Sequence, residues 1–286
     1  MAEFAHAFLL VFGQIGAGGI FSLSVPPFHG IERGFFKSTA AVYLGCAWIA
    51  VLGKGYLTIF APHPPVVAWW AAYRRAAFGR GPEVLAWLAF ACCCTLYVYT
   101  LWGDAFRLRA RAYLLSLACA AAALATSAAS YRLAPLASLE TFVYPVSFLA
   151  SSLLLGGVCT GMALGHWYLI DVGLPIDPFK RAFRFYLGTL LVHLGVIVLG
   201  AAALWLAGAE ASAEALRRLW TDHKALFWLR LALGPLASLP LAYMIWRTLL
   251  IPQTMAATGL FYIATLAAVV GELLGRFILF RTSLPL

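Results

Sequence analysis

The sequence predicts an all-α, polytopic integral membrane protein with eight transmembrane helices, and three observations carry this prediction. Apolar residues make up 63% of the 286-residue chain, and charged residues make up only 11%. Soluble domains average about 45–50% apolar and about 25% charged residues. The mean hydropathy is +0.89. Finally, the apolar residues form long runs, each close to the roughly 20 residues that a helix needs to cross a bilayer.

The predicted spans share this apolar character and are separated by short links that contain most of the basic residues. They cover about residues 6–26, 39–61, 84–103, 112–131, 142–171, 184–207, 226–246 and 255–280. Short links favour antiparallel neighbours. We therefore expect one membrane domain, 1–286, built from two four-helix groups at about 1–131 and 142–286.

The net charge of +9 does not indicate nucleic-acid binding. Lys and Arg in short links are topology determinants of membrane proteins, so membrane lipid is the expected partner and nucleic acid is not. An even number of spans places both termini on the same side. The two sides carry similar numbers of basic residues, and the acidic residues of the 208–225 link favour a periplasmic position for the termini. We expect a bacterial cytoplasmic (inner) membrane.

The six cysteines all lie inside apolar runs and form no CxxC pair. We interpret them as small packing residues and predict no metal site from them. They are Cys46, Cys92, Cys93, Cys94, Cys119 and Cys159.

The last span carries a carboxylate and a guanidinium in the middle of an apolar run. Glu272 and Arg276 lie four residues apart, so a helix stacks them on one face. A charge in hydrocarbon costs at least about 2.5–3.5 kcal/mol on insertion scales. Gly271 and Gly275 leave space for a close neighbouring helix. We expect the pair to face the bundle interior, and the alternative is a pair that snorkels to the membrane surface.

Further ionisable residues gather at the membrane face that carries the termini. Lys54 lies near the end of span two, Arg230 near the start of span seven, and His63 and Glu83 flank a segment whose aromatic and basic residues are typical of the interface. A quinone head group enters from lipid and exchanges protons with water, and a His and a carboxylate can accept those protons. The predicted site for menaquinone or ubiquinone contains Lys54, His63, Glu83, Glu272 and Arg276. The alternative is a set of snorkelling charges.

Three short motifs occur in order along the chain. They are Phe12–Gly13–Gln14–Ile15–Gly16–Ala17–Gly18–Gly19 in span one, Leu155–Gly156–Gly157 in span five and Gly271–Arg276 in span eight. Together with the length, the eight spans and the Ala225–Arg230 start of span seven, they resemble the anchor subunit of bacterial dimethyl sulfoxide reductase. The resemblance covers the chain thinly and is strongest at its two ends.

This resemblance implies a haem-free subunit, related to polysulfide-reductase-type anchors, with periplasmic termini. Such a subunit oxidises quinol in respiratory electron transport and passes electrons to an iron–sulfur subunit, which feeds a large molybdopterin catalytic subunit. The family's functional His and Glu flank the segment after span two, which implies these roles for His63 and Glu83. Here Pro64–Pro65 follow His63, whereas the family has Leu-Gly.

Three alternatives stay open from the sequence. His166 in span five and His193 in span six are predicted at depths in the membrane that differ by only about 6 Å. They are therefore candidate ligands of one haem b. The other interpretation is that they are two hydrogen-bonded histidines within helices. A secondary transporter would use Lys54 and Glu272 as substrate or proton sites, although no inverted repeat is visible. The third alternative is a purely structural anchor.

Overall fold

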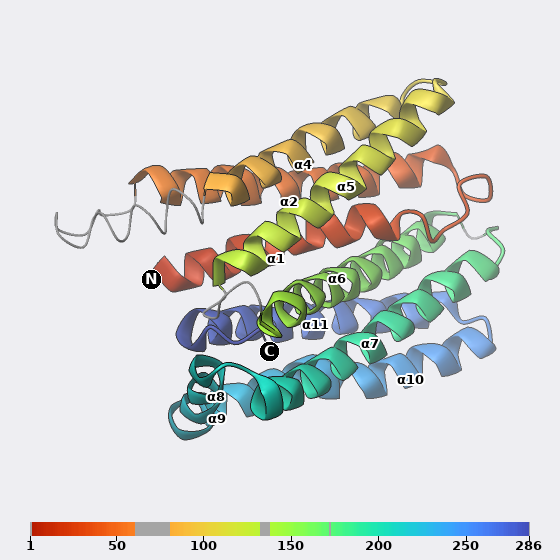
Figure 1. Cartoon of the computed structure of the whole chain (residues 1–286). Helices are drawn as coiled ribbons and strands as arrows, with labels where there is room; N and C mark the ends of the chain where they lie inside the picture. Colours follow the sequence, from red (N-terminus) through yellow and green to blue (C-terminus); the bar gives the residue numbers. More distant parts are fainter. Residues whose placement is uncertain (1, 61–80, 132–137, 172, 286) are drawn as a thin grey trace.

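The protein is a bundle of long helices that run back and forth along one direction (Figure 1). The computed structural model describes residues 2–60, 81–131, 138–171 and 173–285. Within these ranges there is no strand, and eight helical spans are long and apolar enough to cross a membrane. The predicted fold class, an all-α multi-pass membrane protein, is therefore confirmed.

The helices form two groups that follow the order of the chain (Figure 1). The first group comprises α1 (Ala2–Ser22), α2 (Arg33–Phe60), α4 (Gly81–Thr100) and α5 (Phe106–Tyr131). The second comprises α6 (Glu140–Ile170), α7 (Asp177–Ala207), α8 (Glu210–Asp222), α9 (Lys224–Leu231), the π-helical turn η1 (Ala232–Leu236), α10 (Ala237–Leu250) and α11 (Thr254–Thr282). The seventh span consists of α9, η1 and α10 together. Both termini lie at the same end of the bundle.

Several helices begin earlier than the hydropathy predicted. The helices α2, α5 and α7 start at Arg33, Phe106 and Asp177, about six or seven residues before the predicted spans. Basic residues occupy these first turns, and their long side chains can bury their stems while the charged ends stay in the polar interface. The apolar run therefore marks the hydrocarbon-crossing part of each helix and not its full length.

The structure differs from the sequence prediction at the end of the first span and in the 208–225 link. The helix α1 ends at Ser22, earlier than the predicted span, because Pro26 and Pro27 follow and the residue before a proline disfavours helical geometry. The 208–225 link, which was expected to be a loop, contains the amphipathic helix α8. Its buried residues Ala215 and Leu219 form an apolar cluster with Leu204 of α7 and Ile278 of α11.

The two groups meet most closely where α1 crosses α6. A Cβ atom added at Gly18 would lie 1.7 Å from the Ser152 carbonyl oxygen, and one added at Gly156 would lie 2.0 Å from the carbonyl carbon of Gly18. Across the same crossing, Gln14 Nε2 donates to the Phe148 carbonyl at 3.2 Å, and Ser152 Oγ donates to the Gln14 carbonyl at 2.8 Å. Lipid tails are as apolar as leucine, so such close packing and hydrogen bonding hold membrane helices together.

The seventh span is interrupted in its middle. The π-helical turn η1 contains Pro235, which lacks the N–H that a regular helix needs at this position. At this break Gly234 lies against Gly271 of α11, since a Cβ added at Gly271 would be 2.4 Å from Gly234 Cα. The expectation that Gly271 admits a close neighbour is confirmed. The described helices of the first group contain no π-helical turn.

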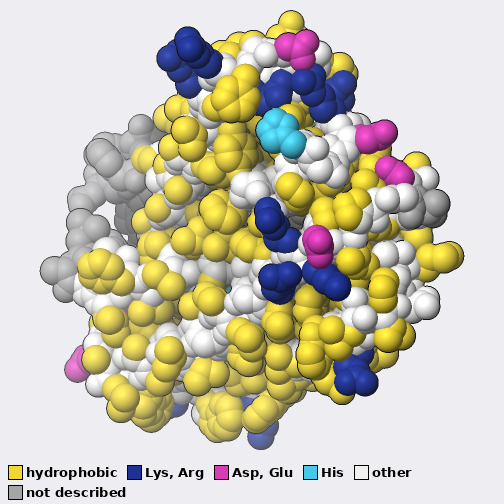
Figure 2. All heavy atoms as spheres, turned by 90° about the vertical axis from the view of Figure 1, so that its right-hand side faces the viewer, with side chains coloured by type: hydrophobic (Ala, Val, Ile, Leu, Met, Phe, Trp, Pro, Cys, Tyr) yellow, Lys and Arg dark blue, Asp and Glu magenta, His cyan; other side chains and the backbone are white. Residues whose placement is uncertain are grey.

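The end of the bundle opposite the termini carries many basic side chains. Figure 2 looks onto this end and shows Lys and Arg standing among apolar side chains. Arg33 Nη1 donates to Asp104 Oδ1 at 2.7 Å, and this hydrogen bond with the guanidinium charge lowers the pKa of the exposed Asp104 carboxyl from its ordinary value. Other basic residues near this end are Lys37, Arg107, Arg109, Arg111, Lys180, Arg181, Arg184 and Arg247.

The α1–α6 crossing gives a test of the fold. We expect Gly156→Ala to lower the free energy of unfolding by about 1–3 kcal/mol, because the added methyl group meets the Gly18 backbone, which has no flexible side chain to move aside. The matched control is Gly45→Ala in α2, where an added Cβ meets nothing within 4 Å. The midpoint of thermal unfolding in detergent checks both variants, and equal midpoints would contradict the close crossing.

Candidate functional site

The ionisable residues predicted to form one cluster are divided between two buried networks, one in each helix group. The Glu83 network includes Lys54, Glu83, Trp87, Ser127 and Ser130. The Glu272 network consists of Ser151, His193, Arg230, Glu272 and Arg276. His63, the remaining member of the predicted quinone site, lies outside the residues that the structure describes.

The Glu83 network links the three helices α2, α4 and α5 through one carboxylate oxygen. Lys54 Nζ donates to Glu83 Oε1 at 2.5 Å, and Ser127 Oγ donates to the same oxygen at 2.6 Å. Trp87 Nε1 donates in turn to Ser127 Oγ at 2.8 Å. Lys54 and Glu83 are only 6% and 5% exposed, so the pair is enclosed by protein and its formal charges cancel.

The position of Glu83 on its helix favours the ionised carboxylate. Glu83 lies in the first turn of α4, where the unpaired N–H groups and the helix dipole stabilise a negative charge. This turn directly follows residues 61–80 in the sequence. A buried carboxylate near a helix end, with a lysine beside it, is a group that can accept a proton from a ligand at the membrane edge.

Trp87 connects this network to the first helix. Its ring packs on α1, because a Cβ added at Gly13 would lie 2.7 Å from Trp87 Cη2. Gly13 belongs to the glycine-rich motif that the sequence singled out, and its missing side chain makes room for the indole. Trp87 and Ser127 were not among the predicted site residues. A single tryptophan or serine in an apolar span gives no sequence signal that it reaches a particular carboxylate.

The Glu272 network joins four spans around a second carboxylate. His193 Nε2 of α7 lies 2.8 Å from Glu272 Oε1, and Arg230 Nη2 of α9 donates to the same oxygen at 3.1 Å. On the other oxygen, Arg276 Nη2 donates to Oε2 at 3.1 Å, and Ser151 Oγ of α6 also donates there. As expected from their spacing, Glu272 and Arg276 face the bundle interior. They are 2% and 1% exposed, so they do not snorkel.

Two guanidinium groups and one imidazole surround the single carboxylate of the Glu272 network. The Arg276 guanidinium carbon also lies 4.6 Å from the centre of the Phe148 ring, a cation–π contact. Phe148 accepts a hydrogen bond from Gln14 of α1, so the charged network is continuous with the contact between the two groups.

The structure does not bring His166 and His193 together. His166 Nδ1 lies 3.0 Å from the Tyr262 hydroxyl, whereas His193 contacts Glu272, ten residues and about 15 Å further along α11. The expected match in depth is wrong because α7 begins at Asp177 and not near residue 184. Measured from the shared end, His166 is about 6 Å deep and His193 about 24 Å deep. This geometry does not support one haem bound by both residues.

Two pockets lie apart from both networks. One, of about 330 Å³, lies between α6 and α7. The other, of about 250 Å³, lies at the end opposite the termini, between the α1–α2 link and α5. Here Arg109 Nη2 donates to the Gly103 carbonyl at 2.6 Å, and the guanidinium carbon lies 5.1 Å from the centre of the Phe28 ring. Arg109 of the second pocket therefore serves the local structure.

Comparison with known proteins gives no assignment: the chain matches no protein-family model and no curated protein. The resemblance to the dimethyl sulfoxide reductase anchor subunit therefore stays a prediction from the sequence motifs. A functional assignment rests instead on the geometry of the two buried networks.

The Glu272 network gives a second test. We expect Glu272→Gln to lower the free energy of unfolding by about 3–5 kcal/mol, because it leaves two buried guanidinium groups without their anion. Glu214→Gln is the control, since Glu214 pairs with Arg217 and Arg218 on the exposed side of α8 and such pairs contribute at most about 1 kcal/mol.

Denaturant unfolding in detergent measures both changes. The double variant Glu272→Gln with Arg276→Gln should recover part of the lost stability, because one uncompensated charge is removed. Equal effects of Glu272→Gln and Glu214→Gln would show that the network contributes no more than a surface ion pair.

Proposed function

We propose that this chain is a membrane anchor and quinol-oxidising (or quinone-reducing) subunit of a multi-subunit oxidoreductase. The observation that supports this proposal is the buried Lys54–Glu83 pair at the first turn of α4. It adjoins in sequence the 61–80 segment that contains His63. A quinone site needs this combination of proton-accepting groups and apolar walls near the edge of the hydrocarbon.

The chemistry assigns a role to each group. Oxidation of a quinol breaks two O–H bonds and releases two protons and two electrons. In the proposed site the Glu83 carboxylate accepts one proton and His63, whose unperturbed pKa is about 6.5, accepts the other. Lys54 holds the carboxylate in place and stabilises its negative charge between turnovers. The oxidant would be a partner subunit whose iron–sulfur centres would take up the two electrons one at a time.

Because the two networks are separate, fewer residues are proposed to contact the quinone than the sequence predicted. Glu272 and Arg276, which the sequence grouped with Lys54 and Glu83, are held by residues of α6, α7 and α9 in the second helix group. We assign them to positioning these helices. The residues proposed to meet the quinone are therefore Lys54 and Glu83, with His63 from the segment between them.

The electrons need a partner protein, because the described part of the chain is almost entirely membrane-spanning helix. We propose an iron–sulfur electron-transfer subunit, with a large catalytic subunit beyond it, docked on the end that carries the termini. The helix α8 supports this position. It lies at that end (Figure 1) and exposes Arg217, Arg218 and Trp220, which offer charged and aromatic contacts to a soluble protein.

A secondary transporter is the second candidate, and one observation favours it. The π-helical break of the seventh span lies at Gly234, against Gly271 and beside the buried charge of Glu272. Interrupted helices next to buried ionisable residues are typical of transport sites. A matching break in the first group, which an inverted repeat would supply, is absent from the described helices of that group.

The quinone proposal is tested with Glu83→Gln in membranes that contain the whole complex. The amide cannot accept a proton, and we expect quinol to reduce the iron–sulfur centres at least about 100-fold more slowly, the usual scale of acid–base catalysis. A chemical reductant should still reduce them at the wild-type rate. Electron paramagnetic resonance after rapid freezing follows both reactions. His63→Ala is expected to behave in the same way.

The control for this experiment is Glu140→Gln. Glu140 is also a buried carboxylate at the end that carries the termini, but it accepts hydrogen bonds from Ala209 N–H and Ser212 Oγ, both at 2.8 Å. Its substitution should leave quinol oxidation unchanged. The double variant Lys54→Met with Glu83→Gln removes both charges, so it avoids the destabilisation expected when Lys54 loses Glu83 as its counter-ion. Quinol oxidation at the wild-type rate in either Glu83 variant would place the reaction elsewhere.

A further prediction concerns assembly. Purification under mild conditions should recover the chain with at least one soluble iron–sulfur partner, bound through the end that carries the termini. Charge reversal of both Arg217 and Arg218 should weaken this complex, whereas reversal of Lys37, at the opposite end, should not. Size-exclusion chromatography with iron analysis measures the association. A chain that is active alone as a purified monomer would contradict the proposal.

A further inference from the structure

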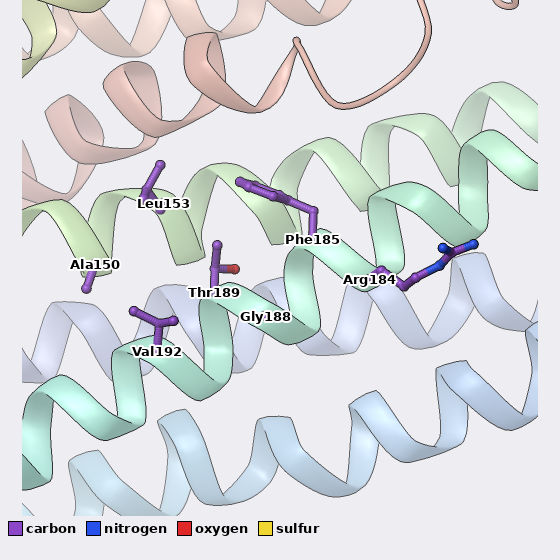
Figure 3. A pocket seen from close by; sticks show the side chains of 7 residues that line it. All are labelled: Ala150, Leu153, Arg184, Phe185, Gly188, Thr189 and Val192. Atoms are coloured by element: carbon purple, nitrogen blue, oxygen red, sulfur yellow. The ribbon is translucent and has the colours of Figure 1, made fainter.

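A groove runs along the outer surface of the second helix group between α6 and α7. It has a volume of about 330 Å³, within the range of about 300–1,000 Å³ typical of small-molecule sites. Ala150 and Leu153 line it from α6, and Gly188 and Val192 line it from α7 (Figure 3). We call this feature the α6–α7 groove.

Small residues create the groove. Gly188 has no side chain, and a Cβ added there would meet nothing within 4 Å. Ala150 contributes only a methyl group on the facing helix. The neighbouring residues Leu191 and Val192 are 52% and 58% exposed, so this side of α7 faces lipid in a membrane. The groove is therefore open to the acyl chains of the bilayer.

A cation stands at one end of the groove. Arg184 lies seven residues, or about 10 Å, from the start of α7, near the level where hydrocarbon gives way to head groups. Figure 3 shows its side chain extending away from the other labelled residues. Within the described part of the chain, its guanidinium has no hydrogen bond or ion pair. Lys180 lies one helical turn earlier, so both cations lie on the same side of α7.

We propose that the α6–α7 groove binds an anionic phospholipid. The phosphate contacts Arg184 and Lys180, and one acyl chain lies along Leu153, Gly188 and Val192. From Arg184 to Val192 the groove extends about 12 Å along α7. Charge decides the occupant: an anionic lipid neutralises the exposed guanidinium, whereas a quinone is uncharged and a zwitterionic lipid brings its own cation. The proposal does not depend on the function proposed above.

Native mass spectrometry of the purified full-length protein, released from nanodiscs, provides the test. Phosphatidylglycerol and phosphatidylcholine are titrated as the anionic and zwitterionic probes. We expect phosphatidylglycerol to be retained preferentially, and Arg184→Gln to weaken its binding about fivefold, the factor that corresponds to about 1 kcal/mol per basic residue at a membrane surface. Gly188→Leu should weaken it at least as much by filling the groove.

The chain offers a matched control for each variant. Arg181→Gln removes an exposed cation of the same helix that does not line the groove, and Gly195→Leu enlarges another α7 glycine whose added Cβ meets nothing within 4 Å. Both should retain phosphatidylglycerol like the wild type. Equal retention of the two lipids, equal effects of groove and control variants, or displacement of the lipid by a quinone would each overturn the proposal.

Discussion

The second half of this protein depends on the burial of Glu272. Two guanidinium groups cannot remain in the interior of a membrane bundle without an anion, and the Glu272 carboxylate supplies it. Its two oxygens also contact Ser151 and His193, so one side chain fixes the relative positions of four spans. Apolar packing is not specific in lipid, and a network of this kind gives the helices a unique register.

The first half is also organised around a buried carboxylate, Glu83, which forms an ion pair with Lys54. Glu83 joins three helices through one oxygen, and Trp87 carries the contact on to Gly13 of α1. The crossing of α1 and α6 then connects the two halves. The bundle is thus organised by two carboxylates and one glycine crossing, and both carboxylates belong to residues that hydropathy alone would exclude from a membrane span.

The sequence was sufficient to predict the class of fold, because length and hydropathy determine which segments can cross a bilayer. It also indicated that Glu272 and Arg276 face inward, since their spacing places them on one face. It did not predict which partners they have. Lys54 and Glu83 are separated by 29 residues, and no local pattern specifies that they pair. The predicted match in depth between His166 and His193 was wrong for a related reason. The apolar run does not locate the first two turns of α7, and this error changes which residues of α6 and α7 lie side by side.

The position of Glu272 in the last helix has a consequence for biogenesis. The chain is synthesised from the N-terminus, so Ser151, His193 and Arg230 enter the membrane before the carboxylate that joins them. Until α11 is inserted, Arg230 lacks Glu272 as its counter-ion, and the nascent protein carries a cation that is unfavourable in hydrocarbon. A chain that stops before α11 keeps this defect permanently. The α11 helix therefore supplies a counter-ion to α9, a helix that precedes it in the chain.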